Sequence, residues 1–243
     1  MTPDLHRQLI ALGLEAGAAH GFALAGGYAV QAHHIVARLS DDVDLFTSWD
    51  RRDEVTAATD HIVSAYRQHG FHVVVADQTD SYVQLLVSPP HAADDPDAAV
   101  KIELVADIRL HEPVATELGL ALHPDDVAAG KMSALFSRAA ARDYIDVAAL
   151  LSGDHYTREQ LIDLATERDG GFDQDVFAQM LDGIHRYKDA DFLRYGITPA
   201  TLRQTRDQIT HWHAQLTRNT RPAPGPSTPP QPPTANRPSR PAR

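Results

Sequence analysis

The chain has 243 residues, enough for one domain of ordinary size with an appendage or for two small domains. Its composition, 43% hydrophobic and 23% charged, is that of a globular protein, and no run approaches the roughly 20 apolar residues that a membrane span requires. The absence of cysteine excludes disulfides, zinc–thiolate sites and thiol nucleophiles. Because the N-terminal residues also lack the apolar core of a signal peptide, we expect a cytoplasmic protein.

The charge is distributed unevenly. Residues 218–243 hold five arginines and no acid, so the net charge of −11 leaves −16 for residues 1–217. An acidic body is not typical of a general nucleic-acid-binding protein. An RNA substrate would therefore have to be contacted locally, through clustered arginines or a bound metal.

The first half alternates predicted helices and strands. Proline near the N-terminus and an apolar stripe predict a helix from about residue 3 to residues 17–21. A short extended piece, 22–25, leads into a glycine pair that opens a helix of about three turns over 28–38. A helix over 50–68 and strands over 43–47, 71–76, 82–87 and 100–105 follow.

The second half changes to helices only. The predicted helices cover 124–139, 143–151, 157–168, 172–185 and 199–216, the last with Thr198 as its cap. We place the change of character near 110–122 and expect a core at 1–112 and a helical domain at 113–217. Nine prolines without apolar periodicity predict a disordered tail at 218–243.

Two acids mark the strand over 43–47. Side chains alternate along a strand, so Asp42, Asp44 and Phe46 share one face while Val43 and Leu45 face the apolar packing. Carboxylates this close raise each other's pKa unless a cation lies between them. Mg²⁺ prefers one or two protein carboxylates and completes its shell with water and phosphate oxygens. The alternative is a pair of solvated acids on a strand edge.

The glycine pair precedes these acids. Gly26 and Gly27 open a helix, and a helix start presents unpaired backbone N–H groups to an anion, while glycine lets a phosphate approach the backbone. The alternative is an ordinary strand-to-helix turn.

Two sequence signatures resemble a known family. The glycine pair followed by a helix and by Asp-x-Asp on a strand resembles the first motif of the nucleotidyltransferase superfamily. The fuller pattern resembles the AbiE-type (AbiEii) toxins, the nucleotidyltransferase half of certain bacterial toxin–antitoxin pairs. A second AbiE-type signature, a lysine on one helix and Arg-Asp-x-x-Asp opening the next, is also present. The residues of the two signatures are Gly26-Gly27 with Arg38-x-Ser40-x-Asp42-x-Asp44, and Lys131 with Arg142-Asp143-x-x-Asp146.

The resemblance implies an α/β fold, a small mixed-sheet nucleotidyltransferase core followed by a helical C-terminal half. It implies transfer of a nucleoside monophosphate from an NTP to a hydroxyl with Mg²⁺ or Mn²⁺, held here by Asp42 and Asp44. The implied role is that of the toxin in a type IV-like pair, with an antitoxin encoded separately. In some members the acceptor is the 3′ end of tRNA.

The resemblance also implies roles for four more residues, and each role has a simpler alternative. Lys131 is implied to face the nucleotide phosphates, and Asp143 or Asp146 to help fix the lysine or the base; the alternative is an ordinary surface pair between Arg142 and Asp146. Glu103 is a candidate third acid, a base toward the incoming hydroxyl; the alternative is an exposed cross-strand ion pair with Lys101 or another neighbour.

Two more residues near the acids have open roles. Ser40 could bind phosphate or position Asp42, or it could be a turn residue. Arg38 could touch phosphate or an aspartate, or it could be a cation at a helix end. We interpret the 14 histidines as mostly surface or core-edge residues, because none forms a zinc-protease pattern.

Two other functions stay open. An enzyme of the same fold could modify a small molecule such as an antibiotic hydroxyl, and the acidic body favours a cationic substrate of that kind. A non-catalytic nucleotide-binding relative is the other alternative, against which both signatures argue.

Overall fold

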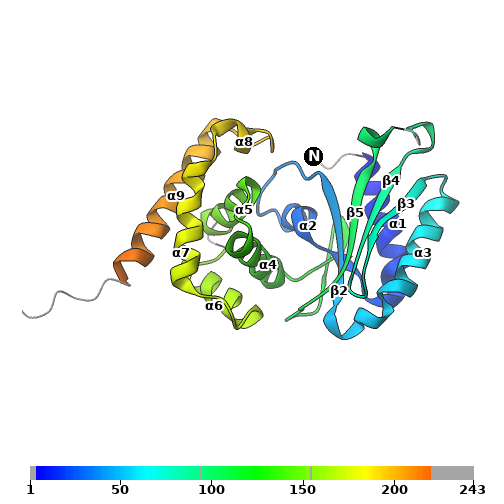
Figure 1. Cartoon of the computed structure of the whole chain (residues 1–243), viewed down its shortest axis with the longest axis horizontal. Helices are drawn as coiled ribbons and strands as arrows, with labels where there is room; N and C mark the ends of the chain where they lie inside the picture. The colour runs from blue at the N-terminus through cyan, green and yellow to red at the C-terminus, as the bar shows by residue number, and fades with distance from the viewer. Residues whose placement is uncertain (1–3, 93–94, 154, 220–243) are drawn as a thin grey trace, which may run out of the picture.

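A seven-stranded mixed sheet forms the first half of the chain in the computed structural model, which describes residues 4–92, 95–153 and 155–219 (Figure 1). The strand order is β3-β4-β5-β2-β1-β7-β6; β2 runs parallel to β5 and β1 parallel to β7, and the other neighbours are antiparallel. The strands are β1 (Ala23–Leu24), β2 (Asp42–Ser48), β3 (His72–Gln78), β4 (Tyr82–Ser88), β5 (Val100–Asp107), β6 (Val114–Thr116) and β7 (Gly119–Ala121).

Helices cover the two faces of the sheet differently. Helices α1 (Asp4–Gly17) and α3 (Val55–Gln68) pack on one face, and α2 (Gly26–Ala32) lies on the other, between the sheet and the helical half (Figure 1). Short 3-10 turns add Ala18–His20, Trp49–Glu54, Pro90–Ala92 and Pro96–Ala98. The alternation in β2 is as predicted, because Val43, Leu45 and Thr47 are buried while the acids point away from that core.

The helical half contains α4 (Pro124–Ser137), α5 (Ala141–Ser152), α6 (Arg158–Arg168), α7 (Gln174–Asp182), α8 (Asp189–Leu193) and α9 (Pro199–Asn219), with a 3-10 turn at Gly183–Arg186. Its core is separate from that of the sheet and is built around Tyr144, Phe177, Phe192 and Trp212. The predicted cap of the last helix is confirmed, since the Thr198 hydroxyl accepts the N–H of Thr201 at 3.1 Å. The site lies between the two cores.

The predicted helix over 28–38 is wrong in its length. Helix α2 ends at Ala32, His34 adopts a left-handed φ of 57°, and the chain then runs as a loop to Asp41. The reason is tertiary packing, because the loop side chains of Ile35 and Val36 pack against the core of the helical half. Arg38 consequently lies in this loop and not at a helix end, which excludes its interpretation as a helix-end cation.

Several short elements escaped prediction. These are β6, β7 and α8, while β1 corresponds to the short extended piece expected before the glycines. Because β6 and β7 join the same sheet, the sheet continues past residue 112 to Ala121, and the division of the chain into domains stays a prediction. The predicted disordered tail lies almost wholly outside the described residues; of it, Arg218 and Asn219 belong to α9. Among the described helices, none is long and apolar enough to cross a membrane.

Candidate active site

A cleft of about 180 Å³ separates the sheet from the helical half. It brings together nearly all of the residues singled out in the sequence, although they come from positions more than 100 residues apart. Those that line it are Gly26, Gly27, Arg38, Ser40, Asp42, Asp44 and Glu103 from the first half and Lys131 from the second. Two predicted site residues, Asp143 and Asp146, are fully buried and do not line the cleft.

Three carboxylates converge on the sheet side of the cleft. The parallel register of β2 and β5 places Asp44 opposite Glu103 and Asp42 opposite Lys101, all on the face turned toward α2. Burial and the neighbouring charge of Glu103 raise the pKa of Asp44 to about 6, although the charge of Lys131 acts in the opposite direction. Asp44 is thus a buried acid beside a second carboxylate, an environment that disfavours its ionised form.

Lys101 is the internal cation of this cluster. Its Nζ atom lies 3.0 Å from Asp42 Oδ2 and 3.0 Å from Glu103 Oε1. Although burial opposes the shift, the hydrogen bond from Lys101 lowers the pKa of Glu103. An ion pair of Glu103 with Lys101 is thus present, within β5 and not across strands, and it lies at the cleft next to Asp44 and Asp42.

The glycine pair lets the loop and β2 approach the start of α2. Gly26 has a φ of +55°, and a Cβ atom there would lie 1.7 Å from Asp44 Oδ2. A Cβ atom on Gly27 would lie 2.3 Å from the Ser40 hydroxyl oxygen. Glycine is therefore required at both positions, because Asp44 and Ser40 approach too closely for a Cβ atom. The sequence pattern alone did not give this reason.

Asp146 joins the two signatures in one buried ionic cluster. Its carboxylate accepts two hydrogen bonds from Arg38, at 2.5 Å from Nε and 2.7 Å from Nη2, and contacts Lys131 Nζ at 3.0 Å. Although burial opposes it, the positive charge of Lys131 lowers the pKa of Asp146. The predicted surface pair between Arg142 and Asp146 is wrong, because Asp146 has no exposure and Arg142 instead reaches to 3.6 Å from Asp42.

Asp143 has a comparable task one turn earlier. Its carboxylate accepts two hydrogen bonds of 3.0 Å from Arg138 and one of 2.9 Å from the N–H of Ala140, at the start of α5. It thereby fixes Arg138, which lines the cleft. Asp143 and Asp146 are positioning residues in this arrangement, and neither opens onto the cleft.

Four charged cleft residues were not among the predicted site residues: Asp126, Arg138, Arg142 and Arg168. Arg142 was noticed only as a partner of Asp146, and Arg168 and Asp126 were not noticed. Arg168 forms an ion pair with Asp107 at the end of β5, and nothing in the local sequence of its helix indicates this contact. Asp126 was detectable only as an acid in the first turn of a helix; its carboxylate accepts the N–H groups of Leu110 and His111.

Solved structures with the same fold include JHP933 from Helicobacter pylori, which is 18% identical over 89% of this chain and 94% of that chain, with a TM-score of 0.57. MenT4, a nucleotidyltransferase toxin from Mycobacterium tuberculosis, is 12% identical over 87% of this chain and 92% of that chain, with a TM-score of 0.40. A comparison with curated protein sequences gave no match.

The family model described as "Nucleotidyl transferase AbiEii toxin, Type IV TA system" matches residues 11–222. This range contains both halves of the fold and every cleft residue described above. The match covers well over half of the chain, and the mixed sheet with its helical half agrees with the fold that the resemblance implied. The chain therefore belongs to the AbiEii family of nucleotidyltransferase toxins, and it is an enzyme of the nucleotidyltransferase class.

Proposed function

We propose that this toxin transfers a nucleoside monophosphate from an NTP to the 3′-terminal hydroxyl of tRNA, and that a separately encoded antitoxin restrains it. The observation that carries the proposal is the convergence of four carboxylates (Asp42, Asp44, Glu103 and Asp126) and five cationic side chains on one cleft. The cations are Arg38, Lys131, Arg138, Arg142 and Arg168. Acids mainly from the sheet side and cations mainly from the helical half suit a metal-bound triphosphate.

The donor set fits a hard divalent cation. Asp42 and Asp44 offer carboxylate oxygens from one strand face, and Lys101 already places a positive charge 3.0 Å from Asp42. Mg²⁺ or Mn²⁺ held by this pair would neutralise charge on the triphosphate and on the leaving pyrophosphate. The pKa of Asp44 is raised first by burial and then by the charge of Glu103, and a bound cation would offset both effects.

The protein's own residues then bind and orient the reactants. Lys131, held by Asp146, faces the phosphates, and the backbone at Gly26 and Gly27 with the Ser40 hydroxyl borders them. The acceptor oxygen forms a bond to the α-phosphorus, the bond from that phosphorus to the bridging oxygen breaks, and pyrophosphate leaves. Once its ion pair with Lys101 has opened, Glu103 accepts the proton of the acceptor hydroxyl.

The arginines of the helical half favour RNA as the acceptor. Arg138, Arg142 and Arg168 bring positive charge to the cleft, although the net charge over residues 1–217 is −16. A polyanion is attracted by such a local cluster, whereas a cationic antibiotic is repelled by it. An acidic protein that modifies RNA needs a local cluster of positive charge of this kind.

The test uses the full chain with α-labelled NTPs, Mg²⁺, and either tRNA or tRNA whose 3′ end has been oxidised by periodate. We expect label on intact tRNA only, and its loss in Asp44→Asn. Asp41→Asn is the matched control, because Asp41 is exposed and precedes the pair without lining the cleft. Label on a cationic antibiotic would establish the small-molecule alternative, and no label on any acceptor would establish the non-catalytic one.

A further inference from the structure

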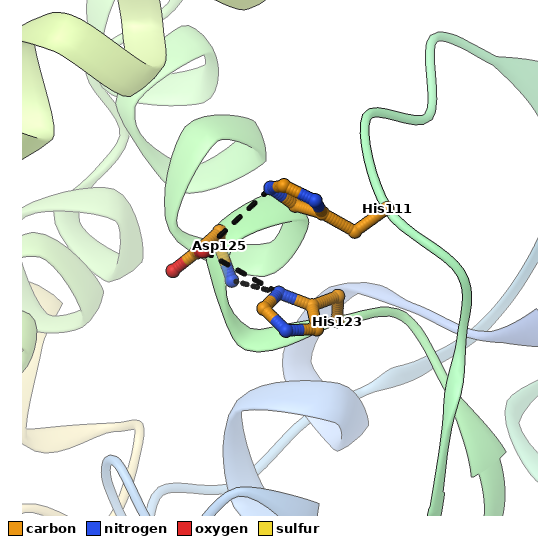
Figure 2. A group of neighbouring side chains, drawn as sticks. All are labelled: His111, His123 and Asp125. Carbon is orange, nitrogen blue, oxygen red and sulfur yellow. Dashed lines mark hydrogen bonds and ion pairs between the residues drawn. The ribbon is translucent and has the colours of Figure 1, made fainter.

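Two histidines and an aspartate form a cluster at the start of α4 (Figure 2). His111 comes from the loop between β5 and β6, His123 caps α4, and Asp125 lies in the first turn. One donor atom of each lies within 4.8 Å of the others. Among the described residues this is the one group of three or more such side chains with that spacing.

The donor separations match the coordination geometry of a small transition ion. Asp125 Oδ2 lies 3.6 Å from His111 Nε2 and 3.5 Å from His123 Nδ1. A tetrahedral zinc ion with bonds of 2.0–2.1 Å separates its ligand atoms by about 3.4 Å. The three donors can therefore close on an ion with small side-chain adjustments.

The groups around the cluster already orient it. The Tyr156 hydroxyl donates to Asp125 Oδ1 at 2.6 Å, which leaves Oδ2 turned toward the histidines. The buried carboxylate of Asp126 accepts the N–H of His111 at 2.9 Å and that of Leu110 at 2.7 Å, and so fastens the loop against α4. In metal sites, residues around the ligands commonly form hydrogen bonds of this kind, which orient the ligating side chains.

We propose that His111, His123 and Asp125 bind a transition-metal ion of the Zn²⁺ class, with water in the fourth position. Two imidazole nitrogens and one carboxylate oxygen suit zinc, cobalt or nickel, whereas Mg²⁺ prefers oxygen ligands alone. The ion takes the lone pair of His123 Nδ1 that now accepts the N–H of Asp125 at 3.2 Å, so that binding exchanges one helix-cap hydrogen bond for a metal bond.

Such an ion would fasten the loop that follows β5 to the helix that carries Lys131. Glu103 lies on β5 and Lys131 on α4, so the two walls of the cleft meet close to this point. The ion would act as a structural link between the halves. Its binding does not depend on the proposed transfer reaction, and it can be measured without that activity.

A second histidine group supplies a matched control. His20 forms hydrogen bonds at both ring nitrogens, with Glu54 at 3.0 Å and with His61 at 3.1 Å, and this group does not bring three ligand atoms within 4.8 Å of one another. We therefore expect His61→Ala to bind metal like the native chain. His123→Asn removes the imidazole but keeps a residue type that caps helices well, which separates ligand loss from helix loss.

The experiment titrates the chelator-stripped full chain with ZnCl₂ by calorimetry, in excess Mg²⁺ to occupy the acidic cleft, and repeats the titration with Co²⁺ in an absorption spectrometer. We expect one zinc equivalent per chain, a tetrahedral Co²⁺ spectrum and a zinc-dependent rise in Tm. His111→Ala and His123→Asn should each weaken this binding at least 10-fold, with His61→Ala unchanged. The proposal is overturned if the native chain does not bind zinc, or if His111→Ala and His123→Asn bind zinc as tightly as the native chain.

Discussion

Substitution of Gly26 by alanine tests the geometry on which the active-site proposal depends. The new Cβ atom would lie 1.7 Å from Asp44 Oδ2 and 2.5 Å from Asp44 Cγ, whereas ordinary contacts begin near 3.4 Å. The Asp44 carboxylate, or the start of α2, must therefore move by roughly 1.7 Å, the difference between these two distances. The φ of +55° adds strain, because the left-handed region costs an L-residue about 1–2 kcal/mol.

These two effects have different consequences. The backbone strain and the displaced contact lower the free energy of unfolding by about 2–4 kcal/mol, which leaves a domain of ordinary stability folded. Misplacement of a catalytic group by about 1 Å can reduce the rate about 100-fold, so we expect Gly26→Ala to transfer nucleotide at least 100-fold more slowly than the native chain.

The assay measures initial rates of label transfer at saturating NTP, and urea unfolding measures stability. Gly170→Ala is the matched control, because a Cβ atom there meets nothing within 4 Å and Gly170 lies outside the cleft. It should keep native activity and native or slightly higher stability. A Gly26→Ala enzyme that works within three-fold of the native rate would refute the reasoning, since Asp44 would then not need its present position.

Three further changes test neighbouring parts of the site. Lys101→Met removes the competing internal cation, so calorimetry should show Mn²⁺ binding about 10-fold tighter; unchanged or weaker binding would contradict this. Gly27→Ala should slow transfer because its Cβ would lie 2.3 Å from the Ser40 hydroxyl oxygen, and Ser40→Gly in the same chain should restore part of the rate; strictly additive losses would argue against that contact. Asp146→Asn leaves two buried cations without a counter-charge and should cost about 3–5 kcal/mol in urea unfolding at neutral pH. Because the folded-state pKa of Asp146 is lowered, this difference should persist down to pH 3.8 and shrink as the pH falls further; a constant difference would contradict the assignment.

Local patterns were sufficient for the regular elements. The strict alternation of β2 identified the face that carries Asp42 and Asp44, because a one-residue error would have placed both acids in the apolar core. Proline and threonine at the start of α9 identified its first turn. Such signals act within a few residues, and the sequence contains them directly.

Contacts across the chain decided what the local patterns could not. The residues after Ala32 have helix-compatible composition, yet Ile35 and Val36 gain more by packing on the helical half than by another turn of α2. The strands β6 and β7 are three residues each, too few for a periodic signal, and they form because β7 pairs with β1 and β6 pairs with β7. Tertiary packing overrode propensity in both places.

The sequence likewise identified the residues of the second signature as a group but did not assign a role to each of them. Arg-Asp-x-x-Asp identifies the residues that matter, but the division of labour depends on depth. Asp143 and Asp146 have no exposure, whereas Arg142 extends to within 3.6 Å of Asp42. An i, i+3 pair of acids at a helix start reads equally well as a surface feature.

The buried cluster of Arg38, Asp146 and Lys131 shows why the two signatures occur together. A buried ion pair adds little to stability compared with apolar packing, because both charges must leave water. Its value here is geometric: Asp146 neutralises one of the two cations, which leaves about one positive charge at the cleft, and it fixes Lys131 on α4 relative to the loop that carries Ser40. Replacing Lys131 by methionine should therefore reduce transfer strongly while Asp146 remains paired with Arg38 and the fold is retained. If Lys131→Met instead destabilised the fold as much as we expect of Asp146→Asn, the lysine would serve the fold and not the phosphates.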